Sequence, residues 1–156
     1  MRLLAIDDSK YSRAAIRKVV AQVRTKETTV CVLHVDEPIT AYISAGMVPH
    51  FVPYVTEVER DRKQQGKALV RRAARELRKA GFKVSEAVEA GDPKAQIIDR
   101  AAEWKANLIV VGSHGLTGLN RFLMGSVSDA VVRHADCSVE VVRIPTSLRR
   151  SKRASR

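Results

Sequence analysis

The stretch VGSHG at residues 111–115, followed after nine residues by GSVS at residues 125–128, decides how this chain is interpreted. It follows an apolar run at residues 108–111 that is typical of a buried strand, and it leads into a pattern at 127–134 that predicts a short helix. Backbone N–H groups converge where a strand, a glycine loop and a helix start meet, which favours an anion. Glycine permits close backbone approach or positive φ, and Ser126 is the expected N-cap.

Glycine spacing alone also fits an ordinary surface loop, so that alternative stays open on this pattern. Two common phosphate-binding signatures do not match. No lysine lies between Gly112 and Ser128, which excludes G-x-x-x-x-G-K-[ST]. The glycines at 112, 115 and 118 are spaced G-x-x-G-x-x-G, and the dinucleotide fingerprint G-x-G-x-x-G belongs to the first strand of its fold.

Residues 111–143 as a whole resemble the C-terminal signature of the universal stress proteins. The nucleotide-binding branch of that family carries G-2x-G-9x-G-[ST], and Gly112, Gly115, Gly125 and Ser126 match it at every spacing. The segments LLAIDDS at 3–9, VLHV at 32–35 and AGDP at 90–93 extend the resemblance over nearly the whole chain up to Ile144.

The resemblance implies an adenine nucleotide, ATP or AMP, with adenine against Val35 and Val111 and ribose near Asp7. It implies Mg²⁺ held mainly by the phosphates and water, because the loop lacks a cluster of carboxylates. From the residues alone, Asp7 could bind a sugar hydroxyl, hold a metal through water, or favour a helix N-terminus. The residues implied in nucleotide binding are Asp7, Val35, Val111, Gly112, Ser113, His114, Gly115, Gly125, Ser126, Val127 and Ser128.

Length and charge set further expectations. A chain of 156 residues suits one domain, which we place at residues 1–146. The net charge is +11, and the polar, basic tail at 147–156 is expected to be disordered. That tail would either attract anions or act as a solvated extension, and the second interpretation is favoured because no aromatic residue accompanies it. We expect a cytoplasmic protein without a membrane or nucleic-acid partner, whose two cysteines are buried thiols.

Strand patterns at 2–6, 28–35, 82–88, 108–111 and 139–144 alternate with helix patterns. Ser9 or Ser12 is the expected first N-cap, residues 55–80 are expected to form a long helix ended by Gly81, and Asp92 is expected to cap the next helix. This order predicts a doubly wound, Rossmann-like α/β fold with five parallel strands and helices on both faces. The resemblance supplies the strand order 3-2-1-4-5, which brings Asp7 and Gly112 to one crevice.

The function implied is an ATP-binding, dimeric stress-response regulator. The alternatives are an AMP sensor and a slow ATPase or nucleotidyl-transfer enzyme; we expect at most weak hydrolysis and assign no catalytic residue or metal ligand. The dimer would form through the edge strand 139–144, where Ser138 replaces a proline usual in the family and Glu140 interrupts the apolar pattern. We expect His34 to be a packed histidine, and the irregular stretch 36–54 to be a lid or a satellite apolar cluster.

Overall fold

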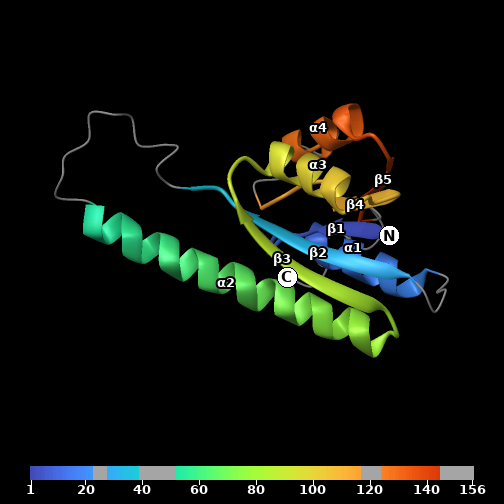
Figure 1. The fold of residues 1–156 in the computed structure, drawn as a ribbon, viewed down its shortest axis with the longest axis horizontal. Coiled ribbons are helices and arrows are strands. Elements are labelled where there is room, and N and C mark those ends of the chain that lie inside the picture. The colour runs from blue at the N-terminus through green and yellow to red at the C-terminus, as the bar shows by residue number, and fades with distance from the viewer. Residues whose placement is uncertain (23–27, 39–51, 117–123, 145–156) are drawn as a thin grey trace, which may run out of the picture.

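The computed structural model describes residues 1–22, 28–38, 52–116 and 124–144 (Figure 1). Its strands pair in parallel in the order β3-β2-β1-β4-β5, which confirms the predicted sheet. β1 and β4 are therefore neighbours, with Leu3 opposite Ile109. The strands are β1 (Arg2–Ala5), β2 (Thr29–Asp36), β3 (Lys83–Ala90), β4 (Leu108–Gly112) and β5 (Ser138–Val142).

Helices cover both faces of the sheet, as Figure 1 shows. Helices α1 (Lys10–Ala21) and α2 (Val52–Lys79) lie on one face, and α3 (Pro93–Glu103) and α4 (Ser126–His134) lie on the other. Successive residues of each strand point to opposite faces. Leu4 therefore packs into the core beneath α1 and α2, whereas Leu3 packs into the core beneath α3 and α4.

Local signals in the sequence set most of the element ends. Ser9 is the N-cap of α1, because its hydroxyl accepts the backbone N–H of Ser12. Gly81 adopts φ +91° immediately after α2, and Asp92 caps α3 with Pro93 at its first position, both as predicted. The helix expected at 55–80 begins at 52 and ends at 79, and the strands expected at 82–88 and 139–144 span 83–90 and 138–142.

The predicted cap of α4 is wrong by one residue. Gly125 is the N-cap, and Ser126 is the first helical residue, with no side chain capping the helix. The hydroxyl of Ser128 donates instead to the carbonyl of Gly125, at 2.9 Å. The first-turn N–H groups of α4 are therefore not satisfied by a side-chain cap.

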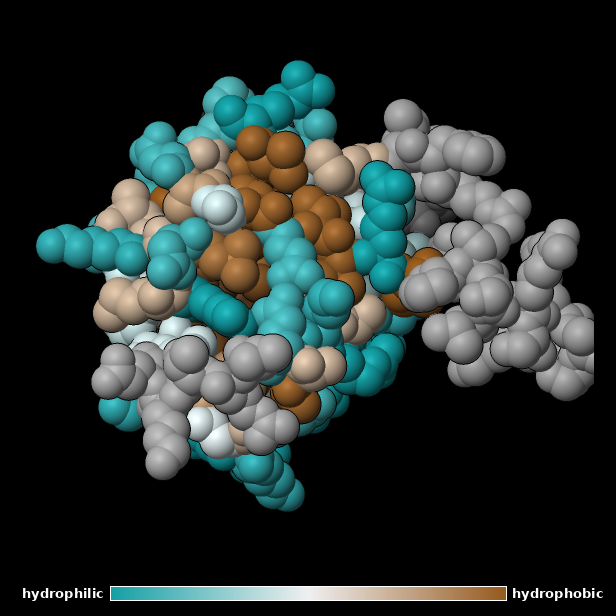
Figure 2. Space-filling view, turned by 90° about the vertical axis from the view of Figure 1, so that its right-hand side faces the viewer, coloured by the Kyte–Doolittle hydropathy of each residue, from teal (hydrophilic) through white to brown (hydrophobic). Residues whose placement is uncertain are grey.

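β5 forms one edge of the sheet. Val139 and Val141 are half-buried, and Val132 on the neighbouring α4 is 45% exposed. Figure 2 looks onto the side where β5 lies in Figure 1, and it shows hydrophobic surface gathered there. Three predictions lie outside the described residues: the tail at 147–156, most of the stretch 36–54, and the part of the glycine spacer at 117–123.

Candidate functional site

A cavity of about 300 Å³ opens at the carboxyl ends of β1 and β4, between the two helical layers. In doubly wound sheets this is where ligands bind, since neighbouring strands there lead to opposite faces. The volume lies at the lower end of the range for small-molecule sites. Ten of the eleven residues predicted to bind the nucleotide line it, Ser113 being the exception.

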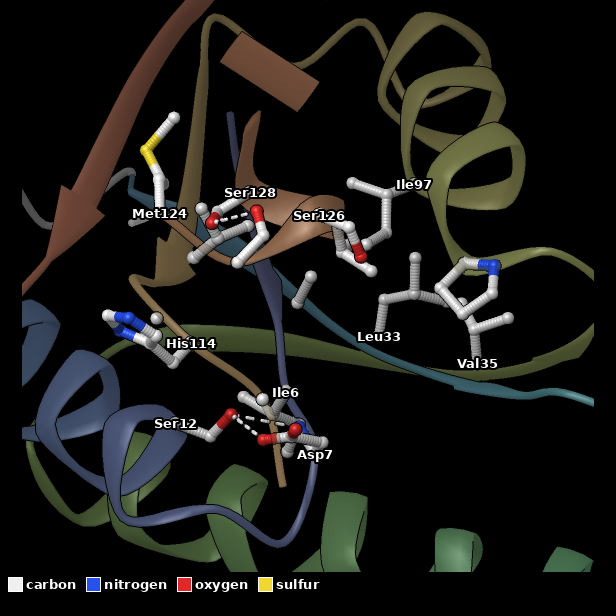
Figure 3. Close-up of a pocket in the computed structure, with 17 residues that line it drawn as sticks. Ile6, Asp7, Ser12, Leu33, Val35, Ile97, His114, Met124, Ser126 and Ser128 are labelled. Atoms are coloured by element: carbon white, nitrogen blue, oxygen red, sulfur yellow. Dashed lines mark hydrogen bonds between the residues drawn. The ribbon is translucent and has the colours of Figure 1, made fainter. Parts of the chain in front are cut away.

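Asp7 follows β1 and is held in one orientation by the start of α1 (Figure 3). Its Oδ1 accepts the hydroxyl of Ser12 at 2.5 Å and the backbone N–H of Ser9 at 3.1 Å. The backbone N–H of Asp7 donates in turn to the Ser12 hydroxyl at 2.9 Å. A Cβ built on Gly115 would lie 3.0 Å from Oδ2, so this second oxygen faces the glycine loop across the cavity.

The loop after β4 is tied to the start of α4 by a short set of hydrogen bonds. The carbonyl of Ser113 accepts the N–H of Gly125 at 2.9 Å and the hydroxyl of Ser128 at 3.2 Å. These bonds fix the two halves of the glycine motif to each other. The uncapped N-terminus of α4 consequently opens into the cavity, where its N–H groups and its dipole favour an anion.

The glycines of the motif meet different obstacles. A Cβ on Gly112 would lie 2.8 Å from Tyr11 Cβ and 2.9 Å from Tyr11 C, so α1 packs directly on this residue. A Cβ on Gly125 would lie 3.2 Å from His114 Cα, within the loop itself. At Gly115 the nearest atom is the tip of the Asp7 side chain. Gly112 thus serves helix packing, whereas Gly115 leaves room beside a charged group in the cavity.

The other end of the cavity is apolar. Leu33 and Val35 from β2 and Ile97 from α3 point into it (Figure 3), and Val111 and Val127 also line it. The cavity therefore has an apolar end that can take a flat ring and a polar end with N–H donors. These ends match the base and the phosphates of a nucleotide. Sequence reasoning found Val35, Val111 and Val127 but missed Leu33 and Ile97.

Ser113 and His114 follow each other in the loop, but only His114 lines the cavity. Ser113 is 1% exposed, and its N–H donates to the carbonyl of Val142 on β5 at 2.9 Å, away from the cavity. His114 lines the cavity, and its ring packs against that of Tyr11 at a centroid distance of 4.8 Å, tilted by 35°. Sequence reasoning treated Ser12 only as a cap. Its place five residues after Asp7, in the first turn of the following helix, brings its hydroxyl to that carboxylate.

His34 is packed and hydrogen-bonded, as expected. Its Nδ1 lies 2.9 Å from the carbonyl oxygen of Ile6, and its Nε2 lies 3.4 Å from Asp36 Oδ1. Cys31 is fully buried and Cys137 half-buried, both as free thiols. Burial raises the pKa of the Cys31 thiol, an effect that the nearby Arg100 guanidinium opposes.

Two absences within the described residues concern metal ions and membranes. No cluster of three or more His, Cys, Asp and Glu side chains that could hold a metal ion was found in those ranges. In the same part of the chain, no helix is both long and apolar enough to cross a membrane.

The fold and the cavity define a doubly wound α/β protein with a glycine loop at its topological switch point. The model of the universal stress protein family matches residues 2–143, and the chain belongs to that family. It is 30% identical over 145 residues to the universal stress protein YxiE of Bacillus subtilis, covering 90% of this chain and 97% of YxiE.

Solved structures have the same fold. The protein MJ0577 superimposes with a TM-score of 0.82 at 26% identity, covering 92% of this chain and 95% of that one. A universal stress protein of Archaeoglobus fulgidus, solved in complex with dAMP, has a TM-score of 0.59 at 22% identity, covering 91% and 96%. The second likeness establishes the shared fold.

Proposed function

We propose that this chain is an ATP-binding universal stress protein that acts as a dimeric, cytoplasmic regulatory module. The observation that carries the nucleotide is the uncapped start of α4, which opens beside Gly115 and Asp7 into a cavity with an apolar far end. Phosphates would lie on the N–H groups of residues 126–128, ribose on Asp7, and adenine between Val35 and Val111. The dAMP bound by the Archaeoglobus protein supports an adenine nucleotide as the ligand class.

The residues present fit such a ligand. A Cβ at Gly115 would intrude beside Asp7 at the polar end of the cavity, and a Cβ at Gly125 would press on the backbone of the loop that forms this end, so the cradle depends on both glycines. Mg²⁺ would be held by the phosphates and water, with Asp7 the one carboxylate in the described part of the chain that lines the cavity. The free cysteines Cys31 and Cys137 are in keeping with a reducing compartment.

Thermal denaturation with and without ATP and Mg²⁺ tests the nucleotide site. A ligand at a hundred times its Kd stabilises the native state by about 2.7 kcal/mol, which corresponds to a rise of roughly 5–11 °C in Tm for a domain of this size. Gly115→Val should remove this rise without unfolding the protein. His114→Ala should reduce it only slightly, because backbone N–H groups would still hold the phosphates. ATP binding by Gly115→Val as tight as by the parent would make the loop purely structural.

Asp7→Ala and Asp8→Ala form a matched pair for the ribose contact. Asp7 lines the cavity, whereas Asp8 is exposed and pairs with Arg13 and Arg72 outside it. Asp7→Ala should weaken ATP binding without abolishing it, and Asp8→Ala should leave it within threefold of the parent, both measured by calorimetry. Equal losses in the two variants would show that net charge, and not a ribose contact, sets the affinity.

The dimer would form by pairing of two β5 edges, because an unpaired edge strand presents free N–H and C=O groups. Glu140 was expected to disturb this pairing. In the structure its Oε2 accepts from Gln22 at 2.6 Å, and Gln22 accepts from Arg2 at 2.7 Å. Glu140 is thus engaged within its own chain on the α1 side. Sedimentation at tens of micromolar should give a dimer; a monomer there would contradict the proposal.

A slow ATPase or nucleotidyl transferase on the same site is the second candidate. Asp7 and His114 are the side chains at the polar end of the cavity that could act as a base. No lysine among the described residues lines the cavity, although phosphoryl transfer requires charge neutralisation, so regulation by binding is favoured. Product formation over hours, compared with that of Asp7→Ala, separates the two functions. Mass analysis of nucleotide released from the denatured protein separates ATP from AMP.

A further inference from the structure

One face of the molecule carries exposed charge almost entirely of one sign. It is formed by α1, which has four Lys and Arg residues and no Asp or Glu, and by residues 65–79 of α2, which have six Lys and Arg residues and one Glu. All ten cations are exposed. We call this surface the basic face; its cations are Lys10, Arg13, Arg17, Lys18, Lys67, Arg71, Arg72, Arg75, Arg78 and Lys79.

The basic face is continuous across the two helices, which lie on the same face of the sheet (Figure 1). Arg13 of α1 and Arg72 of α2 both approach Asp8 Oδ1, at 3.6 and 3.3 Å, so their guanidinium groups lie close together. Arg78 pairs with Glu86 at 2.7 Å. The other seven cations have no ion pair within the described ranges, and such exposed pairs offset little charge in any case.

The opposite face has no such excess. Helix α3 carries two cations and two carboxylates, and α4 carries Arg133 and Asp129, which form an ion pair at 2.9 Å. The charge of the folded domain is therefore segregated onto one layer of helices. A segregated basic surface of this kind is the electrostatic footprint of a polyanion partner.

The side chains of the basic face suit the phosphate groups of such a partner. Six of its ten cations are arginines, whose planar guanidinium matches phosphate oxygens in a bidentate manner. The large hydrophobic residues exposed in the described part of the chain are Met1, Leu116 and Val132, none of them on this face. Insertion into a membrane, and the apolar centre of a protein interface, both require such residues.

The absence of stacking groups selects between single and double strands. Single-stranded nucleic acid is bound largely by stacking its bases on aromatic side chains. The one aromatic residue of α1, Tyr11, is 4% exposed, and residues 65–79 contain none. Residues 65–79 extend over about 22 Å at 1.5 Å per residue, roughly six phosphates along one strand of a duplex.

We propose that the basic face binds the sugar–phosphate backbone of double-stranded nucleic acid without reading its sequence. This departs from the expectation drawn from the sequence, which placed the excess charge in the tail and expected no nucleic-acid partner. The proposal does not depend on the nucleotide cavity, which lies at the carboxyl ends of the strands.

The test measures binding of full-length protein to a labelled 20-base-pair duplex of arbitrary sequence between 50 and 200 mM KCl, a range over which several phosphate contacts lower affinity strongly. The face variant changes five cations of the basic face that have no ion pair within the described residues. The matched control removes the same charge from the tail, and thermal denaturation checks that both are folded. The face variant carries Arg17→Gln, Lys18→Gln, Lys67→Gln, Arg71→Gln and Arg75→Gln; the control carries Arg149→Gln, Arg150→Gln, Lys152→Gln, Arg153→Gln and Arg156→Gln.

We expect the face variant to lose at least about tenfold in affinity at 100 mM KCl and the tail variant to stay within about threefold. The slope of log K against log [KCl] should become shallower by about two or more in the face variant, since each phosphate contact contributes about 0.9. A face variant with the parent's affinity and slope would overturn the proposal. So would tighter binding to a single strand of the same length, or binding to phosphatidylserine vesicles without binding to duplex.

Discussion

Replacing Gly112 by alanine should destabilise the fold, whereas the same change at Gly115 should act mainly on the ligand. A Cβ on Gly112 would lie 2.8 Å from Tyr11 Cβ, 2.9 Å from Tyr11 C and 3.2 Å from Ser12 N. These atoms belong to the first turn of α1 and cannot move without the helix. At Gly115 the single neighbour within 4 Å is Asp7 Oδ2, at 3.0 Å, the end of a side chain.

The size of each stability change depends on which atoms the added methyl group must displace. Forcing a methyl group into a packed contact costs typically 1–3 kcal/mol, so about 2 kcal/mol is expected for Gly112→Ala. For a domain of 156 residues, this lowers Tm by about 4–8 °C. Gly115 is exposed, and Gly115→Ala should change stability by no more than about 0.5 kcal/mol. Its methyl group displaces the Asp7 carboxylate, so affinity for ATP should fall.

The assay is thermal denaturation of the parent and both variants, each with and without ATP and Mg²⁺. Gly112→Ala should melt lower than the parent without ligand, and its Tm should still rise when ATP is added. Without ligand, Gly115→Ala should have the same Tm as the parent. ATP should raise its Tm less than it raises that of the parent. Parental stability of Gly112→Ala, or equal destabilisation by both changes, would refute the assignment of Gly112 to helix packing and Gly115 to the cavity.

Three further changes test other contacts. Ser12→Ala removes the hydroxyl that holds Asp7 Oδ1 at 2.5 Å. Calorimetry should show weaker ATP binding, while the helix cap, in which the Ser9 hydroxyl accepts the backbone N–H of residue 12, stays intact. A change from glycine to alanine normally favours a helix, but the Cβ of Gly66→Ala would lie 2.6 Å from Cδ2 of the partly buried His34 ring, so Tm should fall. Burial raises the pKa of Cys31, so the folded chain holds that proton more tightly than the unfolded chain. The free energy of unfolding should therefore decline as the pH rises into the range of thiol ionisation. Cys31→Ser should flatten that decline.

Most of the fold could be predicted because its signals are local. The apolar strand runs are buried, Gly81 stops α2 with positive φ, and Asp92 with Pro93 starts α3. The strand order could not be derived from these signals, since each strand pairs with residues far away along the chain. It came from the resemblance, and the pairing of β1 with β4 confirms it.

The sequence predicted only those parts of the site whose residues lie within a single segment of the chain. Asp7 and the glycine loop follow their strands directly, so the sequence identified both. Ile97 joins the cavity because α3 crosses the same edge of the sheet, and no periodicity within α3 reveals this. Ser113 was expected at the ligand, but in the structure its N–H is bonded to β5, a partner that the order of elements alone does not identify.

The basic face could not be predicted from the sequence for a similar reason. Counted along the chain, the ten cations of the basic face are spread over seventy positions, and acidic residues, several of them in the first half of α2, lie between them. Folding places α1 and α2 side by side on one layer, whereas the carboxylates of α3 and α4 on the other layer are matched by cations of the same helices. A net charge describes composition, whereas a partner encounters one face of the molecule.

The displaced cap of α4 bears most directly on function. A serine at the N-cap would accept a backbone N–H of the first turn and so compete with a phosphate for it. Glycine at that position costs a helix only a few tenths of a kcal/mol relative to serine, and at residue 125 it also avoids a Cβ 3.2 Å from His114 Cα. Ser128 bonds back to the carbonyls of Gly125 and Ser113, which secures the helix start without occupying its N–H groups. The first turn of α4 is therefore fixed in place while its donors face the cavity.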